Sequence, residues 1–255
     1  MQLAKARFER DGFALLPQLL SATALLQLHA LTPRILERAQ AWQARGADLW
    51  FLQDDVPELA QILEQPSITH QLRKSSGLRD ARFQLFAVTL YCRRPGEPGT
   101  AWHQDARFIP SDLLSALTLW LPLQAVDIAN GPLQFLPGSQ HHCLLMQPHL
   151  ASGRPDGFLH ATPIAVAAPM AFGDATIHAP WTLHGSRRNR TGINRYALIV
   201  NYLCAPIILN SQPELAGPMH PAVVNQLRAA NHRTLLQRIK GAKYCNADNG
   251  RYRQK

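Results

Sequence analysis

The hydrophobic pattern of the sequence changes after Gly77, and this change constrains the fold more than any other feature. Before it, apolar residues such as Leu25, Leu28 and Leu31 recur near helical spacing. After it, the apolar runs are short, strand-like and separated by turns rich in Gly and Pro. A mostly helical first third followed by many short strands predicts an α+β chain.

The first third begins with a short apolar run at 12–16, which is typical of an edge or leading strand. Ser21 then stands at the N-cap position of an amphipathic helix expected over 22–42. The pattern breaks at 51–55. A second amphipathic helix is expected over 56–73.

Strand-type runs follow Gly77 and continue to about residue 205. They are expected over 81–92, 113–126, 133–136, 164–172, 175–178 and 194–204. Turn signals separate them at Asn130-Gly131-Pro132, at Pro137-Gly138-Ser139 and, as a hairpin signal, at Gly173-Asp174. The polar, proline-bearing stretch 141–157 has the length of a lid or substrate-binding loop.

We therefore expect one catalytic domain over residues 1–255. Its core, about 78–205, is predicted to be a double-stranded β-helix of the jelly-roll or cupin kind. The N-terminal helices, within about 1–77, are expected to pack on one sheet. An irregular basic extension is expected over about 206–255, with one short helical stretch at 221–240. Such a core brings residues from distant strands to one mouth.

The composition narrows the class of protein. The net charge of +9 suits nucleic acid, an acidic membrane surface or anionic small molecules. The chain lacks the motifs of nucleic-acid readers, which argues against that partner. Four scattered cysteines are typical of free thiols in a reducing compartment, and no apolar run has the length of a membrane span. These features predict a cytoplasmic protein, with a monomer as the default.

A histidine and an aspartate, His103 and Asp105, follow the turn-rich segment 95–99. Two positions apart on an extended strand, their side chains point to the same face. They supply two of the three ligands of the facial 2-His-1-carboxylate set. This set holds ferrous iron and leaves coordination positions open for oxygen and substrate. His184 is the best-placed third ligand, and His178 is its competitor. For His178 the alternative is a strand histidine bonded to a backbone group.

Several short motifs occur in order between residues 8 and 203. They are Phe8-x-x-Asp11-Gly12-Phe13, Trp102-His103-Gln104-Asp105, Leu119-Trp120-Leu121-Pro122-Leu123, Asn130-Gly131-Pro132-Leu133, Pro137-Gly138-Ser139, Gly173-Asp174, Trp181-x-x-His184-Gly185-Ser186, Asn189 and Arg195. The combination resembles the phytanoyl-CoA dioxygenase family of iron(II)- and 2-oxoglutarate-dependent oxygenases. Trp181 and Gly185-Ser186, which accompany His184, favour it over His178 as the third ligand.

The resemblance implies roles for further residues. Arg195 lies eleven positions after His184, where the family places the basic residue that grips the distal carboxylate of 2-oxoglutarate. A guanidinium suits this role because its planar fork binds a carboxylate with two parallel hydrogen bonds. Ser186 and Thr100 are implied as hydroxyl donors to the cosubstrate, and Gln84 as a weaker contact.

Two points stay open at the level of the sequence. Arg195 is alternatively a structural arginine paired with Asp174 or another acid. The chain also departs from the family at Gln140, where the family usually has His after Pro-Gly-Ser. That position is not an expected metal ligand, so the departure concerns the loop and substrate choice.

The function that follows is oxidation of a small molecule, with Fe(II), 2-oxoglutarate and O2 as metal and cosubstrates and release of succinate and CO2. Because the carboxylate Asp105 is present, the resemblance favours hydroxylation over halogenation. If Arg187, Arg188 and Arg190 line the mouth, an anionic substrate follows. The alternatives are a non-catalytic cupin-like binding or sensor protein and an oxygenase that acts on nucleic acid or protein.

Overall fold

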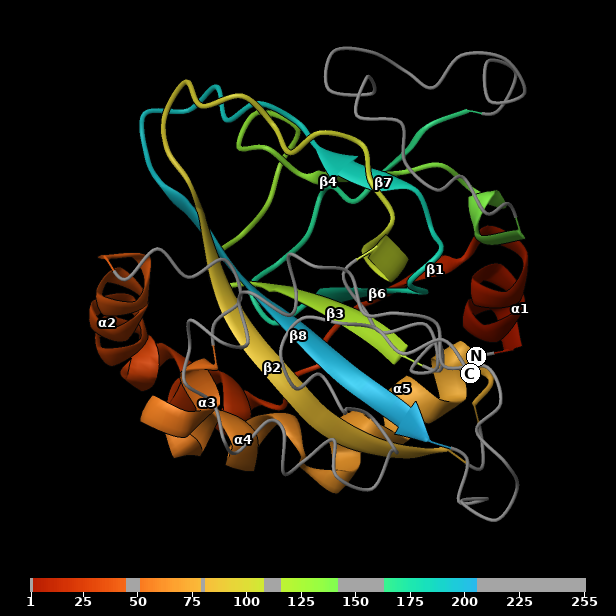
Figure 1. The fold of residues 1–255 in the computed structure, drawn as a ribbon, viewed down its shortest axis with the longest axis horizontal. Coiled ribbons are helices and arrows are strands. Elements are labelled where there is room, and N and C mark those ends of the chain that lie inside the picture. The colour runs from red at the N-terminus through yellow and green to blue at the C-terminus, as the bar shows by residue number, and fades with distance from the viewer. Residues whose placement is uncertain (1, 45–50, 79–80, 108–115, 142–162, 206–255) are drawn as a thin grey trace, which may run out of the picture.

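The computed structural model describes residues 2–44, 51–78, 81–107, 116–141 and 163–205 (Figure 1). Its helices are α1 (Gln2–Asp11), α2 (Ala22–Ala44), α3 (Leu52–Asp55), α4 (Pro57–Leu63) and α5 (Pro66–Ser76), with 3-10 turns at Asp105–Arg107 and Ser139–His141. Its strands are β1 (Phe13–Leu16), β2 (Arg82–Arg93), β3 (Ala116–Pro122), β4 (Leu133–Phe135), β5 (Ala165–Val166), β6 (Ala175–His178), β7 (His184–Ser186) and β8 (Arg195–Ala205).

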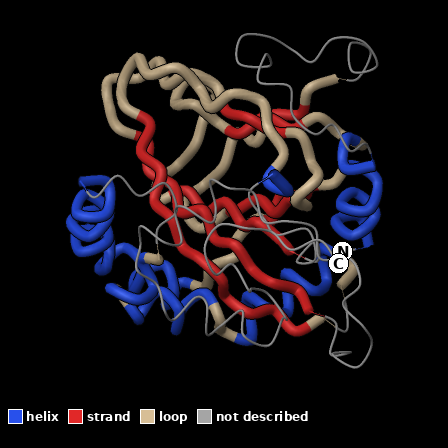
Figure 2. The backbone as a smooth tube through the Cα atoms, in the orientation of Figure 1, coloured by secondary structure: helices blue, strands red, loops and turns tan. Residues whose placement is uncertain are grey.

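The strands form two antiparallel sheets. The large sheet has the order β1-β6-β3-β8-β2, and the small sheet has the order β5-β4-β7. Helices α2 to α5 lie on one side of the large sheet, and the small sheet and most of the loops lie on the other, as Figures 1 and 2 show. The predicted α+β architecture, with helices packed on one sheet, is confirmed.

Alternation along β8 separates an apolar face of the large sheet from a more polar one. Leu198, Val200 and Tyr202 belong to the core shared with the helices, and the Tyr202 hydroxyl donates to the carbonyl of Leu63 in α4 at 2.8 Å. The intervening positions, such as Ala197, belong to a second core shared with the small sheet. Polar residues at these intervening positions therefore face the space between the sheets.

The edge strand β2 carries a bulge between Leu85 and Ala87. The buried amide of Gln53, in α3, donates to the carbonyl of Phe86 at 3.1 Å and accepts from the N–H of Val88 at 3.0 Å. Both polar groups of this side chain are thus satisfied. These two hydrogen bonds attach α3 to β2, the edge strand of the large sheet, where unpaired backbone groups would otherwise remain.

The prediction of one helix over 56–73 is wrong, because the segment forms α4 and α5 with a break between them. Gln65, which precedes Pro66, has φ −54° and ψ 140°, an extended conformation that proline favours in its predecessor. Pro66 then begins α5, where its missing N–H costs nothing. The expected break at 51–55 contains the short helix α3.

The expected hairpin at Gly173-Asp174 is also wrong. Gly173 makes a turn with φ 101°, but β5 and β6 on its two sides belong to different sheets. The chain crosses between sheets there, and of the strand expected over 164–172 only Ala165–Val166 is assigned. Most of the loop 141–157 and the helical stretch 221–240 lie outside the described residues. Of the helices described, none is both apolar and long enough to cross a bilayer.

Candidate metal centre

Two histidines from distant segments meet as paired residues at the centre of the site. The N–H of His103 donates to the carbonyl of His184 at 2.8 Å, and the N–H of His184 donates to the carbonyl of His103 at 2.9 Å. The N–H of Ser186 donates to the carbonyl of Thr100 at 3.1 Å, which extends the pairing. The two imidazoles therefore lie side by side, with ring centroids 4.2 Å apart.

Glycines allow this close approach of the two segments. A Cβ at Gly99 would lie 1.7 Å from the carbonyl oxygen of Ser186, and one at Gly185 would lie 2.8 Å from that of Thr100. Any side chain at Gly99 would thus collide with backbone that it cannot displace cheaply. The spacing of the paired segments depends on these two positions.

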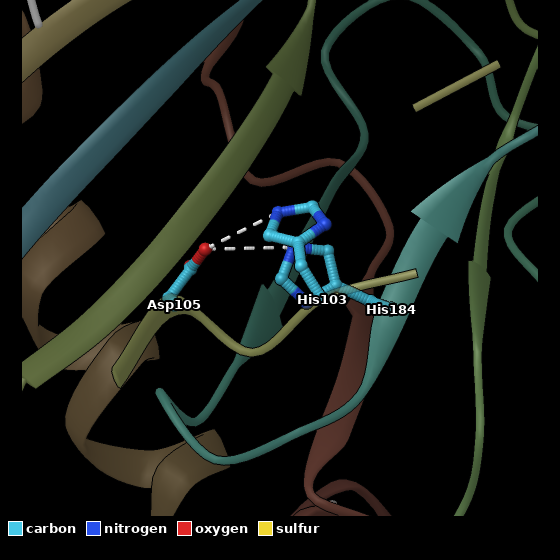
Figure 3. A group of neighbouring side chains, drawn as sticks. All are labelled: His103, Asp105 and His184. Atoms are coloured by element: carbon cyan, nitrogen blue, oxygen red, sulfur yellow. Dashed lines mark ion pairs between the residues drawn. The ribbon is translucent and has the colours of Figure 1, made fainter. Parts of the chain in front are cut away.

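Asp105 completes a group of three possible metal ligands with the two histidines (Figure 3). Its Oδ1 lies 3.6 Å from Nε2 of His103 and 3.6 Å from Nε2 of His184. The three ligand atoms all lie within 4.8 Å of one another. His184 is buried and the other two are half-buried, so the group is reachable from one side.

The protonation pattern of this group fits a cation. Nδ1 of His103 lies 2.8 Å from the carbonyl of Ala101, and Nδ1 of His184 lies 2.9 Å from that of Thr182. A carbonyl only accepts, so each Nδ1 carries the proton and each neutral ring turns the Nε2 lone pair inward. Two lone pairs and a carboxylate oxygen then converge, and a metal ion satisfies such an acceptor-only group.

The pKa shifts act in the same direction. Burial, followed by the charges of His103 and His178, lowers the pKa of His184 well below its usual value and favours the neutral ring. Burial alone would raise the pKa of Asp105, but the surrounding His184, His178 and His103 lower it far below its usual range. Metal ligands must be deprotonated, and these shifts favour that state. Two imidazoles and one carboxylate are a donor set for ferrous iron.

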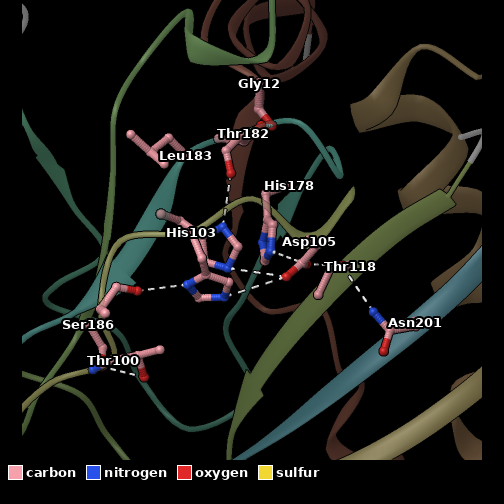
Figure 4. Close-up of polar contacts among 12 residues, drawn as sticks. Gly12, Thr100, His103, Asp105, Thr118, His178, Thr182, Leu183, Ser186 and Asn201 are labelled. Atoms are coloured by element: carbon pink, nitrogen blue, oxygen red, sulfur yellow. Dashed lines mark hydrogen bonds and ion pairs between the residues drawn. The ribbon is translucent and has the colours of Figure 1, made fainter. Parts of the chain in front are cut away.

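The other oxygen of Asp105 has different neighbours (Figure 4). Oδ2 accepts from the hydroxyl of Thr118 at 2.7 Å and lies 3.1 Å from Nε2 of His178. The amide of Asn201 in turn donates to the Thr118 hydroxyl at 3.1 Å. Sequence reasoning treated His178 as a competing ligand or as a strand histidine bonded to a backbone group. It missed this contact with a carboxylate, which depends on strand pairing.

Arg195 lies on the same face of the large sheet and is 2% exposed. Its Nη2 donates to the carbonyl of Gly131 at 3.0 Å, and its guanidinium lies 5.3 Å from the ring centroid of Trp120. Asp174 instead accepts from the backbone N–H groups of Gln18 and Ala171, both at 2.8 Å, so the alternative of an Arg195–Asp174 pair is wrong. Within the described part of the chain, Arg195 forms no ion pair with an acid.

A second guanidinium lies beside the first. Arg93 is the register partner of Arg195 on β2, so their side chains leave the sheet on the same face. Arg93 donates to the carbonyl of Pro98 at 3.0 Å and to the hydroxyl of Thr100. Burial, and next the charge of Arg93, lowers the pKa of Arg195 to about 10. Sequence reasoning missed Arg93, because nothing local indicates which residue faces Arg195.

The two hydroxyls expected at the site contact each other. Ser186 Oγ accepts from the N–H of Thr100 at 2.8 Å and donates to Thr100 Oγ1 at 3.2 Å. On one side, backbone pairing connects the pair to the segments of the ligand histidines. On the other side, the guanidinium of Arg93 donates to the Thr100 hydroxyl. The structure thus brings Thr100 and Ser186 together next to His103 and His184.

The remaining candidates lie farther from the group. Gln84 is exposed on β2, opposite Leu203, and no described residue hydrogen-bonds to its side chain. The amide of Gln140 donates to the carbonyls of Glu9 and Arg10 at 3.2 and 3.1 Å, at the end of α1. Gln140, which stands where the family usually has histidine, therefore binds the end of α1 through its side-chain amide. The arginines of the following turn are exposed, namely Arg187, Arg188 and Arg190.

Comparisons with known proteins place these observations in a wider group. The model of the family described as Phytanoyl-CoA dioxygenase (PhyH) matches residues 8–197. A curated relative, a probable alpha-ketoglutarate-dependent hypophosphite dioxygenase from Stutzerimonas stutzeri, is 29% identical over 124 residues. That match covers 44% of this chain and 42% of the relative, so the chain spans less than half of its length.

Solved structures show the same fold. The carbocyclase SnoK from nogalamycin biosynthesis has a TM-score of 0.64 at 21% identity, over 87% of this chain and 92% of its own. The epimerase SnoN from the same biosynthesis has a TM-score of 0.61 at 22% identity, over 86% and 91%. Both are described as non-heme alpha ketoglutarate dependent enzymes. The predicted jelly-roll type of core is confirmed.

Proposed function

Since this chain belongs to the phytanoyl-CoA dioxygenase family of iron(II)- and 2-oxoglutarate-dependent oxygenases, we propose that it oxidises a small molecule with release of succinate and CO2. The observation that carries the proposal is the convergence of the lone pairs of His103 and His184 with Asp105. We propose that residues 1–255 form one catalytic domain. The proposed reaction type is hydroxylation.

The metal would be held by Nε2 of His103, Nε2 of His184 and Oδ1 of Asp105. Bound iron(II) supplies the activation of O2, with electrons from the decarboxylation of 2-oxoglutarate. The protein fixes the two histidine ligands by paired backbone and by Nδ1 hydrogen bonds to carbonyls, so that the rings do not reorient. Such preorganisation costs nothing at the moment of reaction.

The cosubstrate carboxylate would be held by Arg195. This buried guanidinium has a neighbouring arginine, Arg93, and forms no ion pair with an acid in the described residues, so it is poised to bind an anion. Thr100 and Ser186 offer hydroxyls between the arginine pair and the metal ligands. Gln84 has an uncommitted amide on the same face of the sheet.

The substrate would approach over β8. The side chains of Ile199, Asn201 and Leu203 point from β8 to the face of the sheet that carries Arg195, and all three are half-exposed. They are accessible even though β8 lies between β3 and β2 in the large sheet. We favour a small anion as substrate because exposed arginines follow β7 and the chain carries a net charge of +9. The name of the curated relative, a hypophosphite dioxygenase, supports a small anion.

Anaerobic titration with Fe(II) and 2-oxoglutarate tests the proposal. The weak visible charge-transfer band of the metal–keto acid chelate should appear in the wild-type protein and be absent from His184→Gln. Succinate should then form in aerobic screens of small anions and neutral compounds. Absence of both the band and succinate from the folded wild-type protein would contradict the proposal.

These measurements, together with a nucleic-acid binding assay at several salt concentrations, separate the alternative functions. A band without succinate under any condition would indicate a cupin-like binding or sensor protein. Affinity for DNA or RNA that falls steeply with salt would favour a macromolecular substrate. Succinate that forms with a small anion, together with indifference to polyanions, would support the proposal.

A further inference from the structure

The two oxygens of the Asp105 carboxylate have opposite surroundings. Oδ1 lies 3.6 Å from Nε2 of both His103 and His184. Oδ2 points to the other side, where the hydroxyl of Thr118 donates at 2.7 Å and Nε2 of His178 lies at 3.1 Å. The carboxylate is thus divided into one oxygen on the side of the metal group and one with two donors of its own.

The donors of Oδ2 come from one row across the large sheet. Thr118 on β3 is the register partner of His178 on β6 and of Asn201 on β8. Directly opposed residues point to the same face. Asn201 donates to the Thr118 hydroxyl at 3.1 Å, and this bond directs the Thr118 proton toward Asp105. Two neighbouring strands, β3 and β6, therefore supply the donors to this one carboxylate oxygen, and β8 orients one of them through Asn201.

The proton of His178 is placed by the same logic. A carboxylate that accepts from Thr118 also accepts from the ring, so Nε2 of His178 carries hydrogen. Its Nδ1 is buried and has no hydrogen-bond partner among the residues that the structure describes. The ring is 2% exposed and lies 4.2 Å from the ring of His184 and 5.5 Å from that of Phe135, between centroids. Among the described residues, contact with Oδ2 of Asp105 is the one polar interaction of this side chain.

A packing role alone does not account for His178. An apolar ring would fill the same space and would leave no buried nitrogen without a partner. Direct metal binding does not account for it either. Its Nε2 presents a proton to Oδ2 rather than a lone pair, and the group of atoms within 4.8 Å of one another contains His184 instead.

We propose that His178 and Thr118 are positioning residues that reserve Oδ2 of Asp105 and restrict the carboxylate to metal binding through Oδ1 alone. The inference rests on the proposed function. A facial set of three protein ligands leaves coordination positions open for cosubstrate and oxygen. A carboxylate that bound through both oxygens would occupy one of them. The two donors thus preserve room for 2-oxoglutarate.

The experiment uses the full chain and two variants that remove the donors without removing volume, His178→Phe and Thr118→Val, alone and combined. Thr118→Ser keeps the hydroxyl and serves as the rescue. Thr176→Val is the matched control, because Thr176 lies two residues before His178 on the same strand face and its buried hydroxyl has no hydrogen-bond partner in the described part of the chain. Circular dichroism and thermal unfolding establish that each protein is folded.

Two measurements report the coordination without catalysis. The visible absorption of the Co(II)-loaded protein depends on coordination number, and anaerobic titration of the Fe(II)-loaded protein gives the affinity for 2-oxoglutarate. In the combined variant we expect an altered Co(II) spectrum, Co(II) affinity equal to or above that of the wild type, and at least a tenfold loss of affinity for 2-oxoglutarate. Thr118→Ser and Thr176→Val should match the wild type.

If the combined variant has an unchanged Co(II) spectrum and wild-type affinity for 2-oxoglutarate, the inference is overturned. His178 and Thr118 would then have only a packing role. A loss of Co(II) affinity in the folded variants would overturn it as well, because the donors would then hold the carboxylate in place rather than restrict it. If His178→Phe does not fold, Thr118→Val alone decides through the same two measurements. If the folded wild type gives neither the band with Fe(II) and 2-oxoglutarate nor succinate in the aerobic screens, the proposed function itself fails.

Discussion

His103 and His184 exchange backbone hydrogen bonds in both directions, at 2.8 and 2.9 Å. The relative position of the two imidazoles is therefore set by main-chain pairing and not by side-chain packing alone. Since the pairing exists only if the segments approach closely, residues without metal-binding atoms contribute to the geometry of the site. Gly99 and Gly185 are the residues that permit the approach.

Gly99→Ala should disturb the metal centre although it adds only a methyl group. The new Cβ would lie 1.7 Å from the carbonyl oxygen of Ser186, so the paired backbone must separate. We expect a loss of about 1–3 kcal/mol in the free energy of unfolding. We also expect at least a tenfold loss of Co(II) affinity, measured by absorption titration.

Gly192→Ala is the control for this prediction. A Cβ at Gly192 would meet no atom within 4 Å, so its unfolding free energy should stay within about 0.5 kcal/mol of the wild type. Its Co(II) affinity should be unchanged. Wild-type metal affinity in the Gly99→Ala protein would show that the pairing does not control the ligand geometry.

Arg195→Gln should weaken cosubstrate binding without destabilising the protein that lacks cosubstrate. The buried guanidinium forms no ion pair among the described residues and lies beside Arg93, so its charge is unfavourable until an anion binds. We expect the KM for 2-oxoglutarate to rise about 10- to 100-fold, as the loss of one or two charge-assisted hydrogen bonds predicts. The unfolding free energy in the absence of 2-oxoglutarate should stay equal or increase.

Arg195→Lys and Arg190→Gln complete this test. A lysine keeps the charge but not the planar fork, so its KM should be intermediate. Arg190 is exposed, and its replacement should not change the KM for 2-oxoglutarate. Strong destabilisation by Arg195→Gln, with no change in KM, would instead identify a structural arginine.

Much of the fold was predictable because the relevant signals are local. Short, strand-type apolar runs marked β2 and β8, and the pattern after Ser21 marked α2. The turn glycines also marked the boundaries of the strands. The break before Pro66 was carried by the same local chemistry, since proline disfavours a helical predecessor, but the helical periodicity on both sides obscured it.

The surroundings of the site were less predictable because they depend on strand register. Nothing near Arg93 indicates that it lies opposite Arg195, and nothing near His178 indicates that it lies opposite Thr118. A register shift of one residue would turn each side chain to the other face. The grouping of His184 with His103 and Asp105 was expected from a resemblance in motifs, and the spacing alone had left His178 open.

The stability of the metal-free protein should decrease as the pH falls below about 6.5, the ordinary value for histidine. Burial, with the neighbouring His103 and His178, lowers the pKa of His184 well below that value in the folded state. Between the two pKa values the unfolded chain binds a proton that the folded chain does not bind. The unfolding free energy should therefore fall by up to about 1.4 kcal/mol for each pH unit, starting near pH 6.5.

Urea denaturation at pH 7.5, 6.5 and 5.5, with a chelator present, measures this dependence. The window lies above the ordinary pKa of carboxylates, at which the unfolded chain begins to take up protons on these groups. In the folded state the surrounding histidines lower the pKa of Asp105 further. His184→Gln removes the titrating ring, so its unfolding free energy should change less between pH 6.5 and 5.5. An identical slope in the wild type and in His184→Gln would show that a group other than the buried ligand ring governs the acid sensitivity.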